Sequence, residues 1–216
     1  MVTLQLRQLR VPPGHRLILE EVNWQEFEAI LAELGDHRAT RIAYSQGMLE
    51  LRMPLPEHEV DKEIIGDMVK ILLEELERDC ECFGSTTFKR QDMASGIEPD
   101  QCFYIQNHLA MRGKRRLDLS LDPPPDLAIE VDVTSKTQIE AYEALQVPEL
   151  WRYAEHRFQI YLLHDGKYVE SFTSPIFPDV PVVELISEFV AQSSIEGRSP
   201  TLRTFRQRVR QLRQSQ

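Results

Sequence analysis

Two short apolar runs that each carry carboxylates constrain this chain more than any other feature of its 216 residues. The first is Phe103–Ile105, which follows Pro99 and Asp100 closely, and the second is residues 127–133, which hold Glu130. Short apolar runs bounded by turn residues are typical of buried strands. A carboxylate buried without a partner is costly, so these acids need a cation, a strong donor or access to water. Two facing strands that each present a carboxylate therefore predict a hard-oxygen site for a divalent metal such as Mg²⁺.

The connection between the two runs contains a basic cluster followed by three prolines at 123–125. The cluster consists of Arg112, Lys114, Arg115 and Arg116. The net charge of −10 does not favour nucleic-acid binding, because phosphate neutralisation drives most affinity for DNA. An acidic protein with local basic patches can nevertheless bind DNA in a strongly salt-dependent way. The cluster is therefore a candidate phosphate-contacting surface.

The order of these motifs resembles the PD-(D/E)xK nuclease superfamily: Pro99-Asp100, a long connection, and then Glu130 on an apolar strand. The flanking sequence is similar to the Uma-type restriction endonuclease family, a large bacterial family of unknown function. The segments that carry this similarity are residues 130–137, Tyr142, residues 147–151, Gly47–Glu50, Pro54 and His58.

The resemblance implies a restriction-endonuclease-like core over residues 24–173, in which helices flank a bent mixed β-sheet. The order of predicted helices and strands independently indicates an α/β (α+β) fold. The implied activity is hydrolysis of DNA phosphodiester bonds by an endonuclease that uses Mg²⁺ or Mn²⁺. Asp100 and Glu130 would then be catalytic metal ligands, and the Val131 carbonyl would be a further ligand.

One position departs from the superfamily pattern, which places a lysine two residues after the glutamate. Asp132 stands there in this chain, and Lys136, near the end of the strand, is the candidate substitute. The lysine would orient or deprotonate the attacking water. Asp132 would share a strand face with Glu130, as a further metal ligand or as a partner of Lys136. This departure keeps open an alternative function, a catalytically inactive nuclease-fold domain that binds DNA or a protein partner.

Three further residues are candidates for the site. His58 matches the pattern of the family, and Glu59 lies in the first turn of a predicted helix, where the superfamily often has an acid that points at the metal. The helix dipole also favours acids at this position without any catalytic role. Glu50 is an acid between two leucines on a predicted strand, a position that favours apolar residues.

The length and composition of the chain predict a single domain over residues 1–216. No apolar run approaches the ~20 residues that a membrane-spanning helix needs, and no secretion signal is evident. Three cysteines, an odd number, argue against a disulfide scaffold and favour the reducing cytoplasm. A purely structural or oligomerisation role is also left open, because no strongly basic face is evident.

Several helices and turns have clear local signals. Asn23 and Glu26 predict a capped helix start, Ser45-Gln46-Gly47 predicts a hairpin turn, and the apolar stripe of 57–78 predicts a long acidic helix. Residues 198–216 predict an amphipathic helix with six arginines and no acid. Its arginines could contact phosphates, form a solvated face, or contact the acidic helix across a homodimer.

Overall fold

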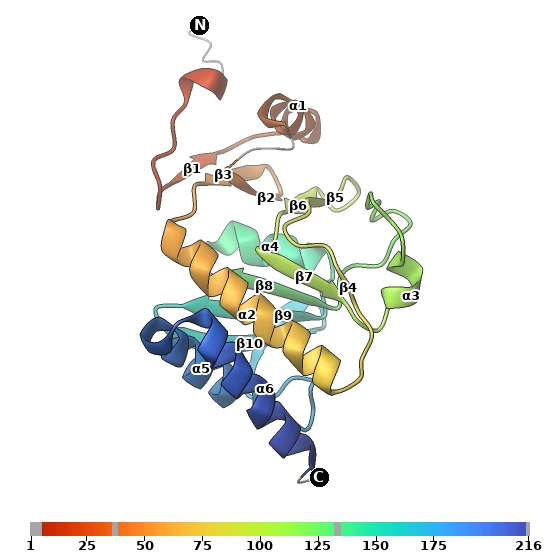
Figure 1. Cartoon of the computed structure of the whole chain (residues 1–216). Coiled ribbons are helices and arrows are strands. Elements are labelled where there is room, and N and C mark those ends of the chain that lie inside the picture. Colours follow the sequence, from red (N-terminus) through yellow and green to blue (C-terminus); the bar gives the residue numbers. More distant parts are fainter. Residues whose placement is uncertain (1–5, 36–38, 132–134, 215–216) are drawn as a thin grey trace, which may run out of the picture.

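The structure is a computed structural model that describes residues 6–35, 39–131 and 135–214, and it contains two β-sheets one above the other (Figure 1). The first sheet has the strand order β1-β3-β2-β6-β5, and all its neighbouring strands are antiparallel. Its strands are β1 (Arg16–Leu19), β2 (Arg41–Ser45), β3 (Met48–Arg52), β5 (Phe88–Arg90) and β6 (Ser95–Ile97).

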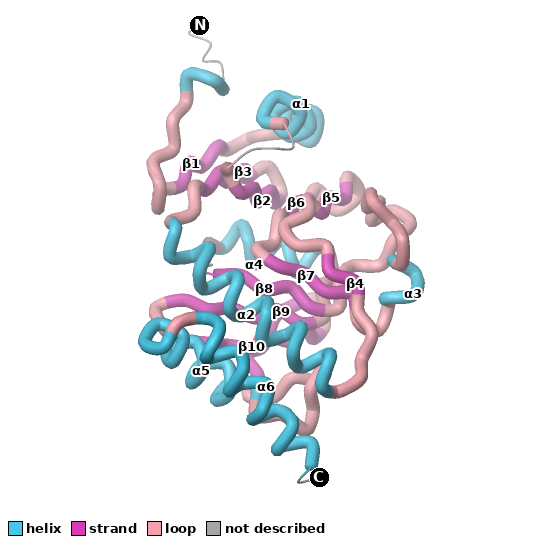
Figure 2. The backbone as a smooth tube through the Cα atoms, viewed as in Figure 1, coloured by secondary structure: helices cyan, strands magenta, loops and turns pink. Residues whose placement is uncertain are grey.

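The second sheet is mixed and has the strand order β11-β10-β9-β8-β7-β4. Figure 2 labels its strands from β10 to β4. Its strands are β4 (Glu81–Cys82), β7 (Gln101–Tyr104), β8 (Leu127–Val131), β9 (Glu149–Ala154), β10 (Arg157–His164) and β11 (Lys167–Ser171). Only β8 and β9 pair in parallel among these described strands, and a helix connects them, as a parallel crossover requires. The two runs predicted as neighbouring strands are β7 and β8, which pair antiparallel.

Helices cover both sheets, which confirms the α/β class predicted from the sequence (Figure 1). Helix α1 packs on the first sheet, α4 lies between the two sheets, and α2, α5 and α6 pack on the other face of the second sheet. A single 3₁₀ turn and the short α3 complete the described elements. The helices and the turn are α1 (Trp24–Leu34), α2 (Pro56–Glu75), α3 (His108–Met111), α4 (Lys136–Ala144), α5 (Val182–Glu196), α6 (Arg198–Gln214) and η1 (Leu6–Gln8). Among the described residues, no helix is both long and apolar enough to cross a bilayer.

Helix α1 begins where the sequence predicts. The backbone N–H of Asn23 donates to Glu26 Oε2 at 2.8 Å, and the N–H of Glu26 donates to Asn23 Oδ1 at 3.0 Å, a complete capping box. One turn later Phe27 is fully buried and stacks on Tyr44 of β2, with 4.5 Å between ring centroids. A local capping signal thus begins this helix, and its aromatic and apolar side chains hold it on the first sheet.

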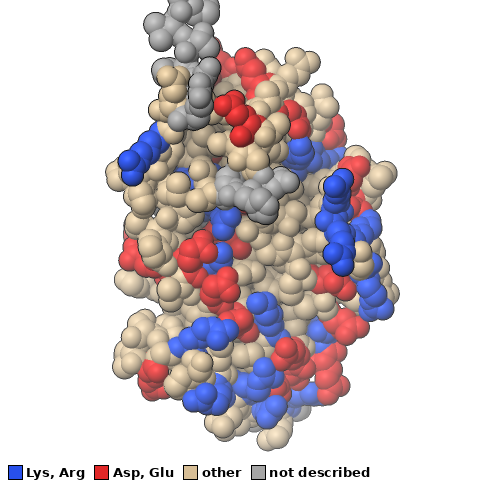
Figure 3. All heavy atoms as spheres, turned by 45° about the horizontal axis from the view of Figure 1, so that its top comes forward, with Lys and Arg blue, Asp and Glu red and all other residues tan. Residues whose placement is uncertain are grey.

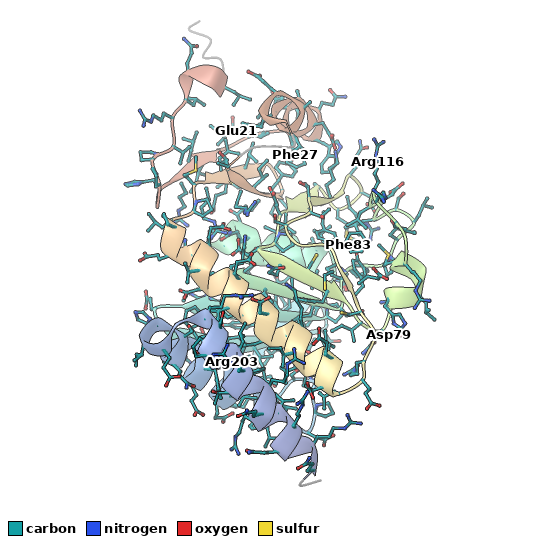
Figure 4. All side chains as sticks on the ribbon, in the orientation of Figure 1. Glu21, Phe27, Asp79, Phe83, Arg116 and Arg203 are labelled. Carbon is teal, nitrogen blue, oxygen red and sulfur yellow. The ribbon has the colours of Figure 1, made fainter. Side chains whose placement is uncertain are left out.

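The arginines of α6 lie along the acidic face of α2 in the same chain. Arg198 pairs with Asp67, Arg206 with Glu74 and Glu75, Arg210 with Glu75, and Arg213 with Glu77. Of the six arginines of α6, only Arg203 and Arg208 have no ion-pair or hydrogen-bond partner among the described residues. Arg203 is labelled in Figure 4. The sequence suggested a contact between the basic tail and the acidic helix across a homodimer, but in the structure this contact forms within one chain.

Glu75 is the centre of this contact, and hydrogen bonds from Arg210 and Arg206 lower its pKa to about 2. A carboxyl whose folded pKa is depressed contributes stability above its ordinary pKa of 4.5, and that stability is lost as the pH falls toward about 2. We expect Glu75→Gln to lower the melting temperature by about 2–4 °C at pH 7, the size of a surface ion-pair cluster in a chain of this length. The difference from the parent protein should shrink as the pH is lowered through this window, and thermal scans between pH 7 and pH 2 measure it. A constant difference would contradict the role assigned to Glu75.

The chain passes from the first sheet to the second through Glu98, Pro99 and Asp100, which connect β6 to β7. The N–H of Glu98 donates to the carbonyl of Ile42 on β2 at 3.0 Å, so this connection stays attached to the first sheet until β7 begins. Asp100 therefore lies at the junction of the two sheets.

Candidate functional site

Asp100 and Glu130 lie together at this junction. Gln101 of β7 is opposite Ile129 of β8, and the same register one residue further places Asp100 opposite Glu130. The N–H of Val131 donates to Asp100 Oδ2 at 2.8 Å. Both carboxylates are buried, with 4% of Asp100 and none of Glu130 exposed. The structure thus brings together the two acids that the sequence singled out.

The guanidinium of Arg52, at the end of β3, lies between these groups. Its Nη1 donates to the Val131 carbonyl at 3.0 Å. Its Nη2 lies 3.3 Å from Glu130 Oε2 and 3.8 Å from Asp100 Oδ1. The three oxygens predicted as metal ligands therefore converge on one cation supplied by the protein itself.

Arg52 belongs to a row of three arginines across the first sheet. It is the register partner of Arg41 on β2 and of Arg16 on β1. Arg41 contacts Glu98 at 3.2 Å and Asp100 at 3.8 Å. Cations of the first sheet thus face the carboxylates of the second, which offsets the cost of burying these acids.

Tyr142 of α4 completes the surroundings of Glu130, because its hydroxyl donates to Glu130 Oε1 at 2.5 Å. Burial, and then the charge of Asp100, raise the pKa of Glu130 well above its ordinary value, although Arg52 and Tyr142 oppose this rise. Burial lowers the pKa of Arg52, but Glu130, Asp100 and Glu50 outweigh it, so the pKa of Arg52 is raised. The centre strongly favours a cation beside its two carboxylates.

A pocket of about 350 Å³ adjoins the centre on the side of Arg52. It lies between the N-terminal segment, β3, the start of α2 and α4. Its lining residues are Gly14, His15, Arg16, Glu50, Arg52, Met53, Leu55, Glu57, His58 and Gln138. The pocket carries both cationic and anionic side chains, and among them Arg52 contacts the two buried carboxylates.

The three further candidates lie around this centre. His58 and Glu50 line the pocket, and Glu50 is only 2% exposed. Glu59 Oε1 lies 3.5 Å from Arg41 Nη2, and Lys62 also pairs with Glu59. Because the contacts of Glu59 are with cations, its position supports a structural role in the arginine row at least as well as metal binding.

The structure does not place Lys136 beside the carboxylates. Its side chain is 87% exposed, and its ammonium lies 3.3 Å from Glu140 Oε1 one turn later in α4. Its assistance to the attacking water stays a prediction. Asp132 lies outside the described residues, so its role as a ligand or a partner also stays a prediction.

The basic cluster at residues 112–116 lies at the opposite end of β7 from Asp100, after α3, and Figure 4 shows Arg116 far from the start of α2. Lys114 pairs with Asp122, and Arg112 lies 4.0 Å from Asp79. Arg115 is exposed, and a phosphate contact by the cluster stays a prediction. On the face drawn in Figure 3, acidic and basic side chains interleave, and neither charge dominates it.

Sequence reasoning missed Arg52, Arg41 and Arg16. The available signal was the alternation in β3, where Glu50 and Arg52 share a strand face at a period of two. Two opposite charges on one face of a strand indicate a polar junction, but their partners come from strands that are distant in sequence. Tyr142, which the sequence marked only as part of the family similarity, is 1% exposed and donates a hydrogen bond to Glu130.

The oxygen atoms of Asp100, Glu130 and the Val131 carbonyl are chemically suited to bind a hard divalent cation. Two carboxylates and one carbonyl converge, which are the oxygen ligands that Mg²⁺ and Mn²⁺ prefer. Two buried polar atoms, Arg52 Nε and Glu50 Oε2, have no hydrogen-bond partner among the described residues. Within the described ranges, no three His, Cys, Asp or Glu side chains group as a metal cluster.

The chain is similar to one protein family over most of its length. The model of the family Uma2, described as putative restriction endonuclease, matches residues 24–193. A crystal structure described as a putative nuclease belonging to DUF820 from Anabaena variabilis ATCC 29413 aligns with 73% of this chain and 91% of its own, at 15% identity and a TM-score of 0.47. No curated protein matches the chain at a significant level.

Proposed function

Since the chain belongs to the Uma2 restriction endonuclease family, we propose that it is a metal-dependent endonuclease that hydrolyses phosphodiester bonds in DNA. The observation that carries the proposal is the convergence of Asp100, Glu130 and the Val131 carbonyl on one cation. Families with this type of core generally use divalent metals. The free thiols of Cys80, Cys82 and Cys102 support the reducing cytoplasm as the place where it acts.

Asp100, Glu130 and the Val131 carbonyl would hold a Mg²⁺ or Mn²⁺ ion. When bound, such an ion polarises a phosphodiester oxygen and lowers the pKa of a water. The N–H of Val131 fixes one oxygen of Asp100, and the hydroxyl of Tyr142 fixes one oxygen of Glu130. These second contacts leave the other oxygen of each carboxylate directed at the cation, an arrangement that preorganises a metal ligand.

The pocket would receive the substrate beside this centre. Arg16 and Arg52 line it and can offset the charge of a phosphate, since guanidinium groups bind phosphate oxygens in pairs. Helix α4 borders the same pocket through the buried Gln138. In this proposal, Lys136 and Asp132, which begin and precede α4, keep the roles predicted from the sequence.

A catalytically inactive domain that binds DNA or a protein partner is the second candidate. The position of Arg52 favours it, because the guanidinium already pairs with both carboxylates without a metal. The exposed position of Lys136, paired with Glu140, also favours it. An inactive domain would retain the fold and the arginine–carboxylate network and would need no metal.

Supercoiled plasmid DNA distinguishes the two candidates. We expect nicking or linearisation in Mg²⁺ or Mn²⁺ and none in EDTA, because the centre needs a hard cation to activate water. Gel electrophoresis measures the products, and a shift assay at low salt measures binding. DNA binding that is equal with and without metal, with no cleavage in either, would favour the inactive domain over the nuclease.

A further inference from the structure

Arg52 separates the pocket from the two buried carboxylates. Its side chain is 12% exposed and lines the pocket, whereas Asp100 and Glu130 are 4% and 0% exposed. Neither carboxylate is among the described residues that line the pocket. An ion that enters from the pocket must therefore pass Arg52 to reach its ligands.

We propose that Arg52 is an exchangeable cation, which pairs with Asp100 and Glu130 while no metal is bound and turns toward Glu50 in the pocket when a divalent ion replaces it. The inference rests on the proposed function, because it takes Asp100 and Glu130 as the metal ligands. The Arg52 side chain would then have two positions. When it occupies the second position, the pocket would be a phosphate-binding site.

The balance of charge is the reason that a metal ion would exchange with the Arg52 guanidinium. Arg52 contacts the same carboxylate oxygens that a metal needs, one at 3.3 Å and one at 3.8 Å. Two carboxylates can offset a divalent ion, but a guanidinium at the same oxygens would add an unbalanced positive charge in a buried place. Repulsion between charges at such distances is strong where water is excluded. Metal and guanidinium therefore compete for one position.

Glu50 offers the second position. It lies two residues before Arg52 on β3, on the same face of the strand, and it is 2% exposed. Its Oε2 has no hydrogen-bond partner among the described residues, and its ion-pair contact with Arg16 is long, at 4.0 Å. A buried carboxylate oxygen without a donor is costly, so Glu50 gains from a second cation. Rotation of one side chain, without movement of β3, is sufficient.

In the second position Arg52 would join Arg16 at the pocket, whose volume is about 350 Å³. Two guanidinium groups facing one space recognise the oxygens of a phosphate diester. A metal at the carboxylates and a phosphate in the pocket would both favour this position. Binding of one should then strengthen binding of the other, because coupling between two sites is reciprocal.

Titration of Mn²⁺ into the metal-free full chain, followed by the EPR signal of free Mn²⁺, tests the exchange without any cleavage assay. Removing the competitor in Arg52→Gln is expected to tighten Mn²⁺ binding by about tenfold or more. The matched control is Arg157→Gln, which removes an exposed arginine that pairs with Glu170, and its affinity should equal that of the parent. Equal or weaker binding by a folded Arg52→Gln variant would overturn the proposal.

Glu50→Gln provides a second test in a chain that keeps Arg52. It removes the acceptor for the displaced guanidinium, so Mn²⁺ binding should weaken several-fold, and the same change in an Arg52→Gln background should have no effect. The dinucleotide d(TpT) should tighten Mn²⁺ binding in the parent but not in Arg52→Gln. Additive effects of the two substitutions, or no coupling with d(TpT), would contradict the exchange.

Failure of this proposal differs from failure of the proposed function. If Mn²⁺ binds the parent and Asp100→Asn removes that binding, the metal centre stands, and the Arg52 variants decide the exchange alone. If Mn²⁺ binds neither the parent nor Arg52→Gln, both the metal centre and the exchange are wrong.

Discussion

Asp100→Asn is expected to reduce DNA cleavage by about a hundredfold to a thousandfold or more, the loss typical of one preorganised electrostatic contact. The asparagine oxygen can still accept from the N–H of Val131, so the fold should remain. The neighbouring negative charge that raises the pKa of Glu130 is lost with the substitution. The variant therefore removes a metal ligand with little strain, and initial rates of plasmid nicking in Mg²⁺ and Mn²⁺ measure the effect.

Asp165→Asn is the matched control for this experiment. Asp165 is exposed at the turn between β10 and β11 and has a positive φ of 49°, a conformation that asparagine tolerates well. The same chemical change at this remote position should leave the cleavage rate unaltered. If both variants nicked DNA as fast as the parent, Asp100 would have no part in the reaction, and another centre or a contaminating nuclease would be responsible.

Arg52→Gln is expected to destabilise the metal-free protein by about 3–5 kcal/mol at pH 8, the usual cost of leaving a buried charge without its partner. The guanidinium contacts Asp100, Glu130 and the Val131 carbonyl, and glutamine cannot replace its charge. Urea unfolding in EDTA measures the loss. Addition of Mn²⁺ should recover a large part of it, because a bound cation restores the balance of charge.

The stability that is lost in Arg52→Gln should depend on pH, and the titration of Glu130 determines whether the loss grows or shrinks as the pH rises. The folded pKa of Glu130 is raised well above the ordinary value, so this carboxyl contributes stability at low pH that is lost as the pH rises through the folded pKa. Arg52 opposes the rise, and its removal shifts the pKa of Glu130 further upward. The stability difference between variant and parent should therefore be small near about pH 5 and grow toward about pH 8.

Two further variants serve as controls for the predicted destabilisation by Arg52→Gln. Arg157→Gln, an exposed arginine on β10, should change stability by less than about 1 kcal/mol. The double variant with Arg52→Gln and Glu130→Gln should be more stable in EDTA at pH 8 than Arg52→Gln alone, because it also removes a buried charge. If Arg52→Gln matched the parent at every pH, the guanidinium would contribute nothing to the buried carboxylates.

The local elements of this chain were predictable because their signals lie within a few residues of sequence. The capping box of Asn23 and Glu26 begins α1, and the hairpin signal at 45–47 joins β2 to β3. The apolar runs around Asp100 and Glu130 became the paired strands β7 and β8, which placed these two acids side by side. Hydrogen bonding and apolar periodicity act over short distances, so the residues involved are visible together in the sequence.

The counter-ions of the site were decided only by the tertiary structure. Asp100 and Glu130 predicted that a cation was needed, and the sequence suggested a metal and Lys136. The structure adds Arg52 and Arg41 from the other sheet and leaves Lys136 exposed. A buried carboxylate requires opposite charge nearby without specifying its position along the chain. The sequence by itself determined the acids and the strands that carry them. Which cations meet them depended on how the two sheets join at residues 98–100, a contact between segments far apart in sequence.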